Sequence, residues 1–343
     1  MILIALLAIL AVVFVAPFLS HKVERNLEVF LFIMGLLAAV VSRVLDFKLA
    51  REALVEPIKI SLAVLVFGVV FKYTREYVHH SIQRVLRVIP LTIFVFLMVV
   101  ILGLLSSVIT AIIASLFLVE IISGLKLNRK LDIRLVVVAC FAIGLGAALT
   151  PIGEPLSTIA IAKLRGEPHY ADFFFLARLL SIYIIPGIIG FGVLAVVLLR
   201  GKGDGEALEE KEKPETMLHV GLRAGKTYLF VMALVFLGSG FKPIIDNYVA
   251  HWGSSLLYWA NMTSAILDNA TLAAAEISPN MAVLQIKSAL VGLLISGGML
   301  IPGNIPNIIS AGKLKITSKE WAKVGVPLGL ATMVIYFLIL HPW

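Results

Sequence analysis

The chain is dominated by long, nearly continuous apolar runs, without the alternation that marks the strands of a membrane barrel. Runs long enough to cross a bilayer lie at about residues 2–19, 27–45, 56–72, 134–164, 172–199, 226–241, 281–312 and 322–340. Two further segments, 88–124 and 244–277, carry polar residues near their middles. Each is either a re-entrant hairpin of two short helices or one long crossing. The pattern therefore predicts an all-α polytopic membrane protein.

Composition supports this class. Of 343 residues, 60% are hydrophobic and 15% are charged, whereas soluble domains carry about 25% charged residues. A water-soluble enzyme, a disordered chain and a disulfide scaffold are therefore excluded. The net charge of +8 does not indicate a nucleic-acid partner, because Lys and Arg collect in the cytoplasmic loops of membrane proteins. The bilayer is the expected partner. Cys140 is the only cysteine, so no intramolecular disulfide or cysteine metal site is expected.

The distribution of basic residues predicts the orientation. With both ambiguous segments taken as hairpins and the N-terminus placed outside, 20 Lys and Arg residues fall inside and 9 fall outside. This bias favours eight crossings with both termini outside. Residues 2–19 lack the basic start of a signal peptide, so we expect a first transmembrane helix there.

Three blocks of sequence recur in the same order, at offsets of 170, 157 and 150 residues. The pairs are Val66–Lys72 with Phe236–Lys242, Ser107–Ile109 with Ser264–Ile266, and Gly153–Leu164 with Gly303–Leu314. Each copy would hold three crossings, an odd number, so the second copy would be inverted relative to the first. Inverted-topology repeats are typical of secondary transporters.

The repeat predicts four parts. Residues 1–50 form two N-terminal helices, 56–199 the first repeat, 200–222 a polar cytoplasmic linker, and 223–343 the second repeat. Each repeat contains one hairpin, at about 88–124 or 244–277. Each also contains one broken transmembrane helix, at about 134–164 or 281–314.

Two proline- and glycine-containing segments interrupt the apolar runs at matched positions, Thr150–Pro155 and Pro302–Pro306. Proline removes a backbone donor and glycine weakens helix preference. Irregular backbone at membrane depth persists only where it lines a cavity or is buried in protein. The freed carbonyls and helix ends can hold an ion; a proline kink without a ligand is the alternative.

Polar side chains cluster at the hairpin tips and the breaks. Hydroxyl and amide oxygens suit sodium, although such residues also serve in helix packing. A carboxylate at membrane depth is costly and usually functional, which singles out Glu154 and Asp268. Glu120, Glu276 and Lys287 lie either at a site or at the membrane interface. The candidate cation ligands are Ser106, Ser107, Thr110, Thr150, Gly153, Glu154, Ser157, Thr158, Asn261, Thr263, Ser264, Asp268, Asn269, Gly303, Asn304 and Asn307.

The segment Thr263–Leu272 resembles the hairpin motif of the ion transporter superfamily. The likeness is to NhaD-type sodium/proton antiporters and arsenite permeases, which carry a similar Ser-Ala-x-x-Asp-Asn element, here Ser264–Asn269. The whole chain resembles a compact group of predicted cation transporters in that superfamily. Over most of residues 56–340, the resemblance implies inverted repeats and a midplane ion site, and it implies a homodimer. The first hairpin, Ser106–Ile112, departs from the motif because it lacks the Asp-Asn pair.

Together these features predict a secondary active transporter in a cell membrane, expected to be a prokaryotic plasma membrane. The expected activity is exchange of sodium or another monovalent cation for protons by alternating access. Asp268 or Glu154 would carry the proton, and no cofactor is expected. A sodium-coupled symporter or exporter of a small organic or oxyanion substrate is the alternative, and a passive channel is the next. An enzyme fits least well, because the histidines lack metal-ligand spacing.

Overall fold

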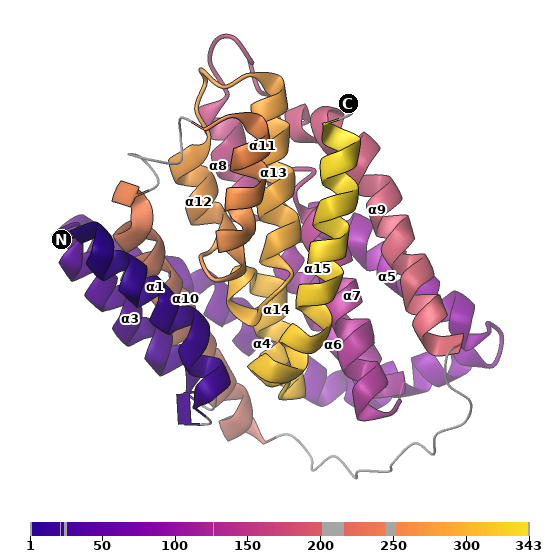
Figure 1. Ribbon diagram of the computed structural model, residues 1–343. Helices are drawn as coiled ribbons and strands as arrows, with labels where there is room; N and C mark the ends of the chain where they lie inside the picture. Colours follow the sequence, from indigo (N-terminus) through magenta and orange to yellow (C-terminus); the bar gives the residue numbers. More distant parts are fainter. Residues whose placement is uncertain are drawn as a thin grey trace.

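A computed structural model describes residues 2–20, 22–23, 26–125, 127–200, 216–244 and 252–341. All regular structure in these ranges is helical (Figure 1). The first half contains α1 (Ile2–Leu19), α3 (Leu27–Val41), α4 (Phe47–Leu86), α5 (Leu91–Ile109), α6 (Ala111–Leu125), α7 (Arg129–Ala147), α8 (Pro155–Lys163) and α9 (Phe175–Arg200). The second half contains α10 (Met217–Ile244), α11 (Ser254–Ala260), the 3-10 helix η2 (Asn261–Ala265), α12 (Asn269–Glu276), α13 (Val283–Gly297), the 3-10 helix η3 (Ile301–Gly303), α14 (Ile305–Leu314) and α15 (Ser318–Leu340).

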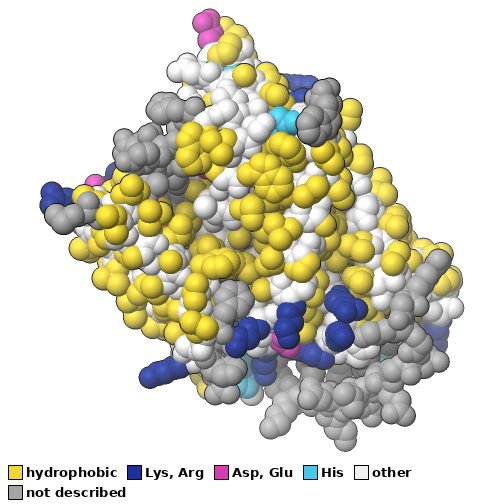
Figure 2. All heavy atoms as spheres, viewed as in Figure 1, with side chains coloured by type: hydrophobic (Ala, Val, Ile, Leu, Met, Phe, Trp, Pro, Cys, Tyr) yellow, Lys and Arg dark blue, Asp and Glu magenta, His cyan; other side chains and the backbone are white. Residues whose placement is uncertain are grey.

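Five of the described helices, α4, α5, α9, α10 and α15, are long and apolar enough to cross a membrane by length and composition. Shorter apolar helices, α1, α3, α6 and α13, accompany them. Hydrophobic side chains cover most of the face seen in Figure 2, whereas Lys and Arg side chains gather along its lower edge. These features agree with a multi-pass membrane protein. Most of the predicted linker, 201–215, and part of the second predicted hairpin, 245–251, lie outside the described residues.

Both predicted helix breaks are present. α7 ends at Ala147 and the next α-helix begins at Pro155; α13 ends at Gly297 and, after the 3-10 helix η3, the next α-helix begins at Ile305. Proline is favoured in the first turn, where a missing backbone N–H costs nothing. Each new helix follows an extended residue, Glu154 (φ −157°, ψ 160°) or Asn304 (φ −153°, ψ 149°).

One predicted boundary needs correction. The crossing expected at 56–72 belongs to α4, a single helix of 40 residues. Its first turns contain Lys48, Arg51 and Glu52, which the hydropathy pattern assigns to a loop although Lys, Arg and Glu are good helix formers. In the second predicted hairpin the helices are interrupted at Ile266–Asp268, within the polar segment Asn261–Asn269. In the first hairpin the interruption lies at Thr110, where φ is 77°.

Helices from the two halves of the chain pack against each other next to the two helix breaks. α5, α7 and α9 pack together in the first half, and α13 packs against α11, η2 and α15 in the second. The short helix after each break packs against a helix of the other half, α8 on α12 and α14 on α6. Figure 1 shows α8 and α12 in the upper part of the molecule and α14 and α6 in the lower part.

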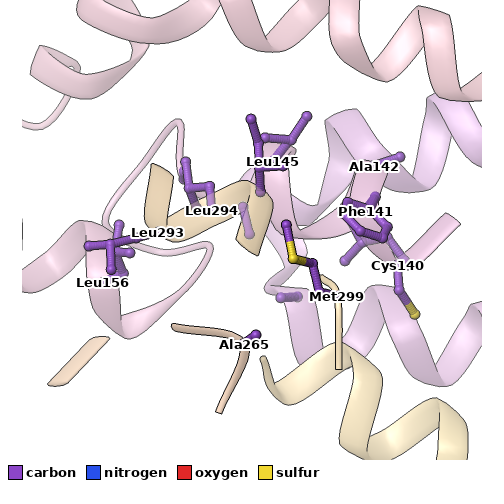
Figure 3. Packing of buried hydrophobic residues seen from close by; sticks show 14 of the residues in the cluster. Cys140, Phe141, Ala142, Leu145, Leu156, Ala265, Leu293, Leu294 and Met299 are labelled. Atoms are coloured by element: carbon purple, nitrogen blue, oxygen red, sulfur yellow. The ribbon is translucent and has the colours of Figure 1, made fainter. Parts of the chain in front are cut away.

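Buried hydrophobic side chains fill the region where the broken helices meet. Figure 3 shows Phe141 and Leu145 of α7 beside Met299, which follows α13. All three side chains are buried. A Cβ atom at Gly298 would come within 2.5 Å of the Phe141 ring, so the backbone of the second break lies directly against α7.

Close contact between α5 and α7 depends on glycine. A Cβ atom at Gly146 would overlap the carbonyl oxygen of Gly103. We expect Gly146→Ala to force these helices apart and lower the free energy of unfolding by about 1–3 kcal/mol. Thermal unfolding of the purified protein measures the change.

The matched control is Gly190→Ala in α9, where a Cβ atom has no neighbour within 4 Å. Alanine has the higher helix preference, so this variant should be as stable as the wild type or more stable. Equal stability of Gly146→Ala and Gly190→Ala would contradict the close packing of α5 on α7.

Candidate functional site

The two breaks are held by equivalent hydrogen bonds. Ser157 Oγ donates to the carbonyl oxygen of Ala147 at 3.5 Å, and Asn307 Nδ2 donates to that of Gly297 at 2.8 Å. The two donor residues are 150 positions apart in the sequence, and so are the two acceptor residues. This is the offset between the matched blocks Gly153–Leu164 and Gly303–Leu314. The backbone turns also match, with Gly153 N to Thr150 O at 3.2 Å and Gly303 N to Leu300 O at 3.3 Å. Each break is therefore stabilised by a side chain from the helix that follows it.

Glycine is required at equivalent points of both breaks. A Cβ atom at Gly153 would overlap the Ala147 carbonyl oxygen. At Gly303 it would lie 2.5 Å from the Gly297 oxygen and 2.7 Å from the carbonyl oxygen of Ser264. The second break is therefore pressed against the backbone of η2.

The breaks differ in the residue that precedes the new helix. Asn304 is 4% exposed, and its Oδ1 accepts a hydrogen bond from Ile305 N at 2.8 Å. Glu154 is 6% exposed, and its side chain makes no capping bond to its own helix. One break therefore places a carboxyl group in the interior, and the other uses its amide oxygen locally.

The start of α12 and the residue before it supply the partners of Glu154. Asn269 Nδ2 donates to Glu154 Oε2 at 3.5 Å, whereas Glu154 Oε1 is buried without a hydrogen-bond partner. The charge of Asp268 is close enough to act on Glu154 and also on Glu56 of α4. The predicted carboxylates Glu154 and Asp268 thus belong to one cluster. Glu56 was missed because it sits among charged residues that resemble a loop.

The second break also faces α7. Asn304 Nδ2 lies 3.0 Å from the Cβ position of Gly144, a residue that sequence reasoning missed because one glycine in an apolar helix carries little signal. Asn307 Nδ2 donates to both Gly297 and Leu300, and its Oδ1 is buried without a hydrogen-bond partner.

Most predicted hydroxyl ligands donate to backbone carbonyls, which leaves their oxygen lone pairs as acceptors. Ser106 and Ser107 of α5 bond to the preceding turn, and Ser264 bonds to Leu293 of α13. Thr150 donates to the Ser107 carbonyl, and Ala111 N donates to Gly153 O at 2.9 Å. The end of α5 and the start of α6 therefore contact the first break.

The structure does not gather every candidate. Thr158 and Thr263 are exposed and donate to nearby carbonyls. Thr110 is partly exposed, and its hydroxyl accepts from Ile113 N at 3.3 Å. Asn261 is fully buried, with Nδ2 donating to Ala289 O at 3.1 Å. Thr158 lies in the first turn of α8, where its backbone N–H donates to the Glu154 carbonyl oxygen at 3.5 Å, and the other three residues lie within the two predicted hairpins.

The three undecided residues have distinct partners. Glu120 of α6 forms an ion pair with Lys313 of α14, with Nζ and Oε1 2.7 Å apart and side chains 4% and 13% exposed. Lys287 of α13 lies over the ring of Tyr183 at 5.3 Å. Glu276 is hydrogen-bonded by Asn261. Lys313 aligns with Lys163 in the predicted repeat, so the sequence comparison already marked a lysine shared by the two blocks.

The described residues contain no group of three or more His, Cys, Asp and Glu side chains that could hold a metal ion. A cation in the cluster would therefore rely on carbonyl, amide and hydroxyl oxygens as well. A small cavity of about 20 Å³ borders Ile266, Ile301 and Pro302. The larger hollow of about 550 Å³ is an open groove lined by Glu28 and Lys226, and none of its lining residues is a candidate ligand.

Comparison with known proteins adds a family. Residues 3–342 match the family described as "Protein of unknown function (DUF1646)". The chain belongs to this family. A search of curated proteins found no match. The DUF1646 match spans both broken helices and both halves, so the polar cluster lies within the region that defines the family.

Glu120→Gln tests the ion pair between α6 and α14. It removes the carboxylate from a Lys313 ammonium that is largely buried, and breaking a buried pair costs about 3–5 kcal/mol. We expect a matching fall in the free energy of unfolding, measured by denaturant titration in detergent.

Asp172→Asn is the control, because Asp172 and Arg178 form an ion pair whose side chains are both more than half exposed. It should leave stability nearly unchanged. The double variant Glu120→Met with Lys313→Met should recover most of the loss, since a buried pair can be replaced by apolar residues. Equal effects of Glu120→Gln and Asp172→Asn would contradict the structural role of the buried pair.

Proposed function

We propose that the protein is a secondary active transporter that exchanges sodium, or another monovalent cation, for protons across a cell membrane. The observation that carries the proposal is Glu154. This carboxyl group is buried at a helix break, is bonded on one oxygen by Asn269, and has no hydrogen-bond partner on the other. Buried ionisable groups of this kind in membrane proteins are usually functional.

A single carboxyl group can couple two ions. An ionised carboxylate has only acceptor oxygens, and in the interior its charge must be compensated by a cation or removed by a proton. Sodium and a proton therefore compete for Glu154. Asp268 adds a second negative charge beside it, which favours a cation and raises the cost of leaving both groups ionised. Oxygens of the breaks and of Asn307 would complete the cation shell.

The inverted repeat remains part of this proposal. The matched bonds from Ser157 and Asn307, the sequence blocks at the same offset, and the crossed packing of α8 on α12 and α14 on α6 support it. In this arrangement α5 with α6 and α11 with α12 are the two re-entrant hairpins. Transport would proceed by movement of the hairpins and half-helices against the remaining helices.

Transport in proteoliposomes tests the function. An imposed sodium gradient should drive proton movement, detected with a pH-sensitive dye trapped inside. Glu154→Gln should abolish this flux, because the amide cannot exchange a proton. Asn269→Ala should raise the half-saturating sodium concentration about tenfold or more, since a hydrogen bond to a charged group contributes about 1.5–3 kcal/mol.

Glu167→Gln is the control, because Glu167 is an exposed carboxylate in the loop after α8; it should transport as the wild type does. If Glu154→Gln and Asp268→Asn both exchange sodium for protons at the wild-type rate, the proposed cation site is wrong. Sodium-dependent uptake of a labelled carboxylate without proton movement would favour the symporter instead.

Cysteine labelling tests the topology. In a Cys140→Ala background, Val88→Cys and Lys130→Cys mark the ends of the first hairpin, and Gly253→Cys and Asn280→Cys mark the ends of the second. All four positions are exposed. With re-entrant hairpins, an impermeant thiol reagent should label both members of a pair from one side, and the two pairs from opposite sides. Labelling of Val88→Cys and Lys130→Cys from opposite sides would make 88–124 a crossing.

A further inference from the structure

A second buried carboxyl group lies on the same short helix as Asn269. Glu276 is the last residue of α12 and is 2% exposed. Its hydrogen-bond partner is Asn261, which is fully buried at the start of η2. Asn261 is fixed in turn, because its Nδ2 donates to Ala289 O at 3.1 Å and its carbonyl accepts from Ser296 Oγ. This is a rigid pair, held by α13.

The two oxygen atoms of this pair that lack hydrogen-bond partners favour a protonated Glu276. Glu276 Oε2 and Asn261 Oδ1 are both buried without a hydrogen-bond partner. An ionised carboxylate and an amide oxygen are both acceptors, so they cannot bond to each other. A protonated Glu276 carries an O–H that can donate to an acceptor, while the amide N–H donates to the other carboxyl oxygen. Acid and amide then satisfy one another, and no buried charge remains.

The two buried glutamates of the proposed hairpins, Glu120 and Glu276, differ in the charge of the group beside them. Glu120 of α6 lies 2.7 Å from the Lys313 ammonium, which compensates an ionised carboxylate. Glu276 of α12 instead meets a neutral amide. The helices that pack against α12 are α8, α13 and α10, and their ionisable side chains, with that of Glu154 just before α8, are Glu154, Lys163, Lys287, His219, Arg223, Lys226, Tyr228 and Lys242. Of these, Lys287 lies over Tyr183 and Lys226 pairs with Glu28.

Glu276 also lies between the cluster and one end of the molecule. Asn269, at the other end of α12, donates to Glu154; seven residues of helix separate it from Glu276, or about 10 Å. Only four residues beyond Glu276, Asn280 is exposed. The loop between them is anchored by His169, whose Nε2 is 3.0 Å from the carbonyl oxygens of Pro279 and Met281.

We propose that Glu276 and Asn261 form a second proton-binding site, through which protons pass between the Glu154 cluster and the end of the bundle that carries Asn280. The proton is gained and released at Glu276 Oε2, and only an O–H bond forms and breaks. The relay to Glu154 rests on the proposed function, whereas proton binding by Glu276 does not.

Infrared spectroscopy of the full-length protein in lipid nanodiscs tests the site, because a protonated carboxyl group has a carbonyl stretch that an ionised one lacks. A pH titration of the wild type should show the appearance of this band for Glu276. Glu276→Gln should remove one titrating band. Asn261→Ala should keep that band but shift its frequency, because the hydrogen bond to the amide is lost. Glu120→Gln is the matched control, because Glu120 is a buried glutamate of α6 paired with Lys313, and it should leave the band assigned to Glu276 unchanged.

Infrared spectra recorded with added sodium distinguish a failure of this proposal from a failure of the proposed function. Adding sodium to the wild type should remove the band of Glu154 and leave that of Glu276. If sodium changes no band but Glu276→Gln still loses one, the proton site stands and sodium exchange at Glu154 fails. If Glu276→Gln and the wild type give the same titrating bands, the second proton site is overturned. A circular dichroism spectrum identical to that of the wild type establishes that each variant is folded.

Discussion

The arrangement depends on satisfying the backbone of two interrupted helices inside an apolar core. Each break frees carbonyl groups where water and lipid cannot bond to them, and an unsatisfied group there costs several kcal/mol. Ser157 and Asn307 meet this demand at equivalent positions. Because each bond comes from the helix beyond the break, the two halves of each broken helix stay in register. The chain can therefore end a helix in the core and still present a defined set of oxygens.

The two breaks differ in the residue that precedes the new helix, and this difference decides which break carries an ionisable group. An asparagine at the start of α14 bonds to its own backbone and adds no charge. A glutamate at the start of α8 reaches the opposite half of the chain. This one difference gives the first break a buried carboxyl group that the second break lacks. The first hairpin, which lacks the Asp-Asn pair, contributes backbone and hydroxyl contacts instead.

Much of the fold follows from the sequence because proline, glycine and long apolar runs act locally. Pro155 and Pro306 placed both breaks, and the buried carboxyl group at Glu154 followed from its position beside one of them. The ends of α4 could not be predicted, since Lys48 and Arg51 are compatible with helix and loop alike. The residues that contact Glu120 and Glu276 could not be predicted from the sequence either. They depend on how α14 packs on α6 and how η2 packs beside α12, contacts between segments far apart in the chain.

The length of α4 has a practical consequence. Forty residues of α-helix extend about 60 Å, roughly twice the hydrocarbon thickness of a bilayer. Even a tilted helix of this length exceeds that thickness, so part of α4 extends beyond the hydrocarbon layer. A rigid helical extension continuous with the transmembrane region is a natural epitope for an antibody fragment. Such a fragment would give particle images of a small membrane protein the asymmetric feature that they need for alignment.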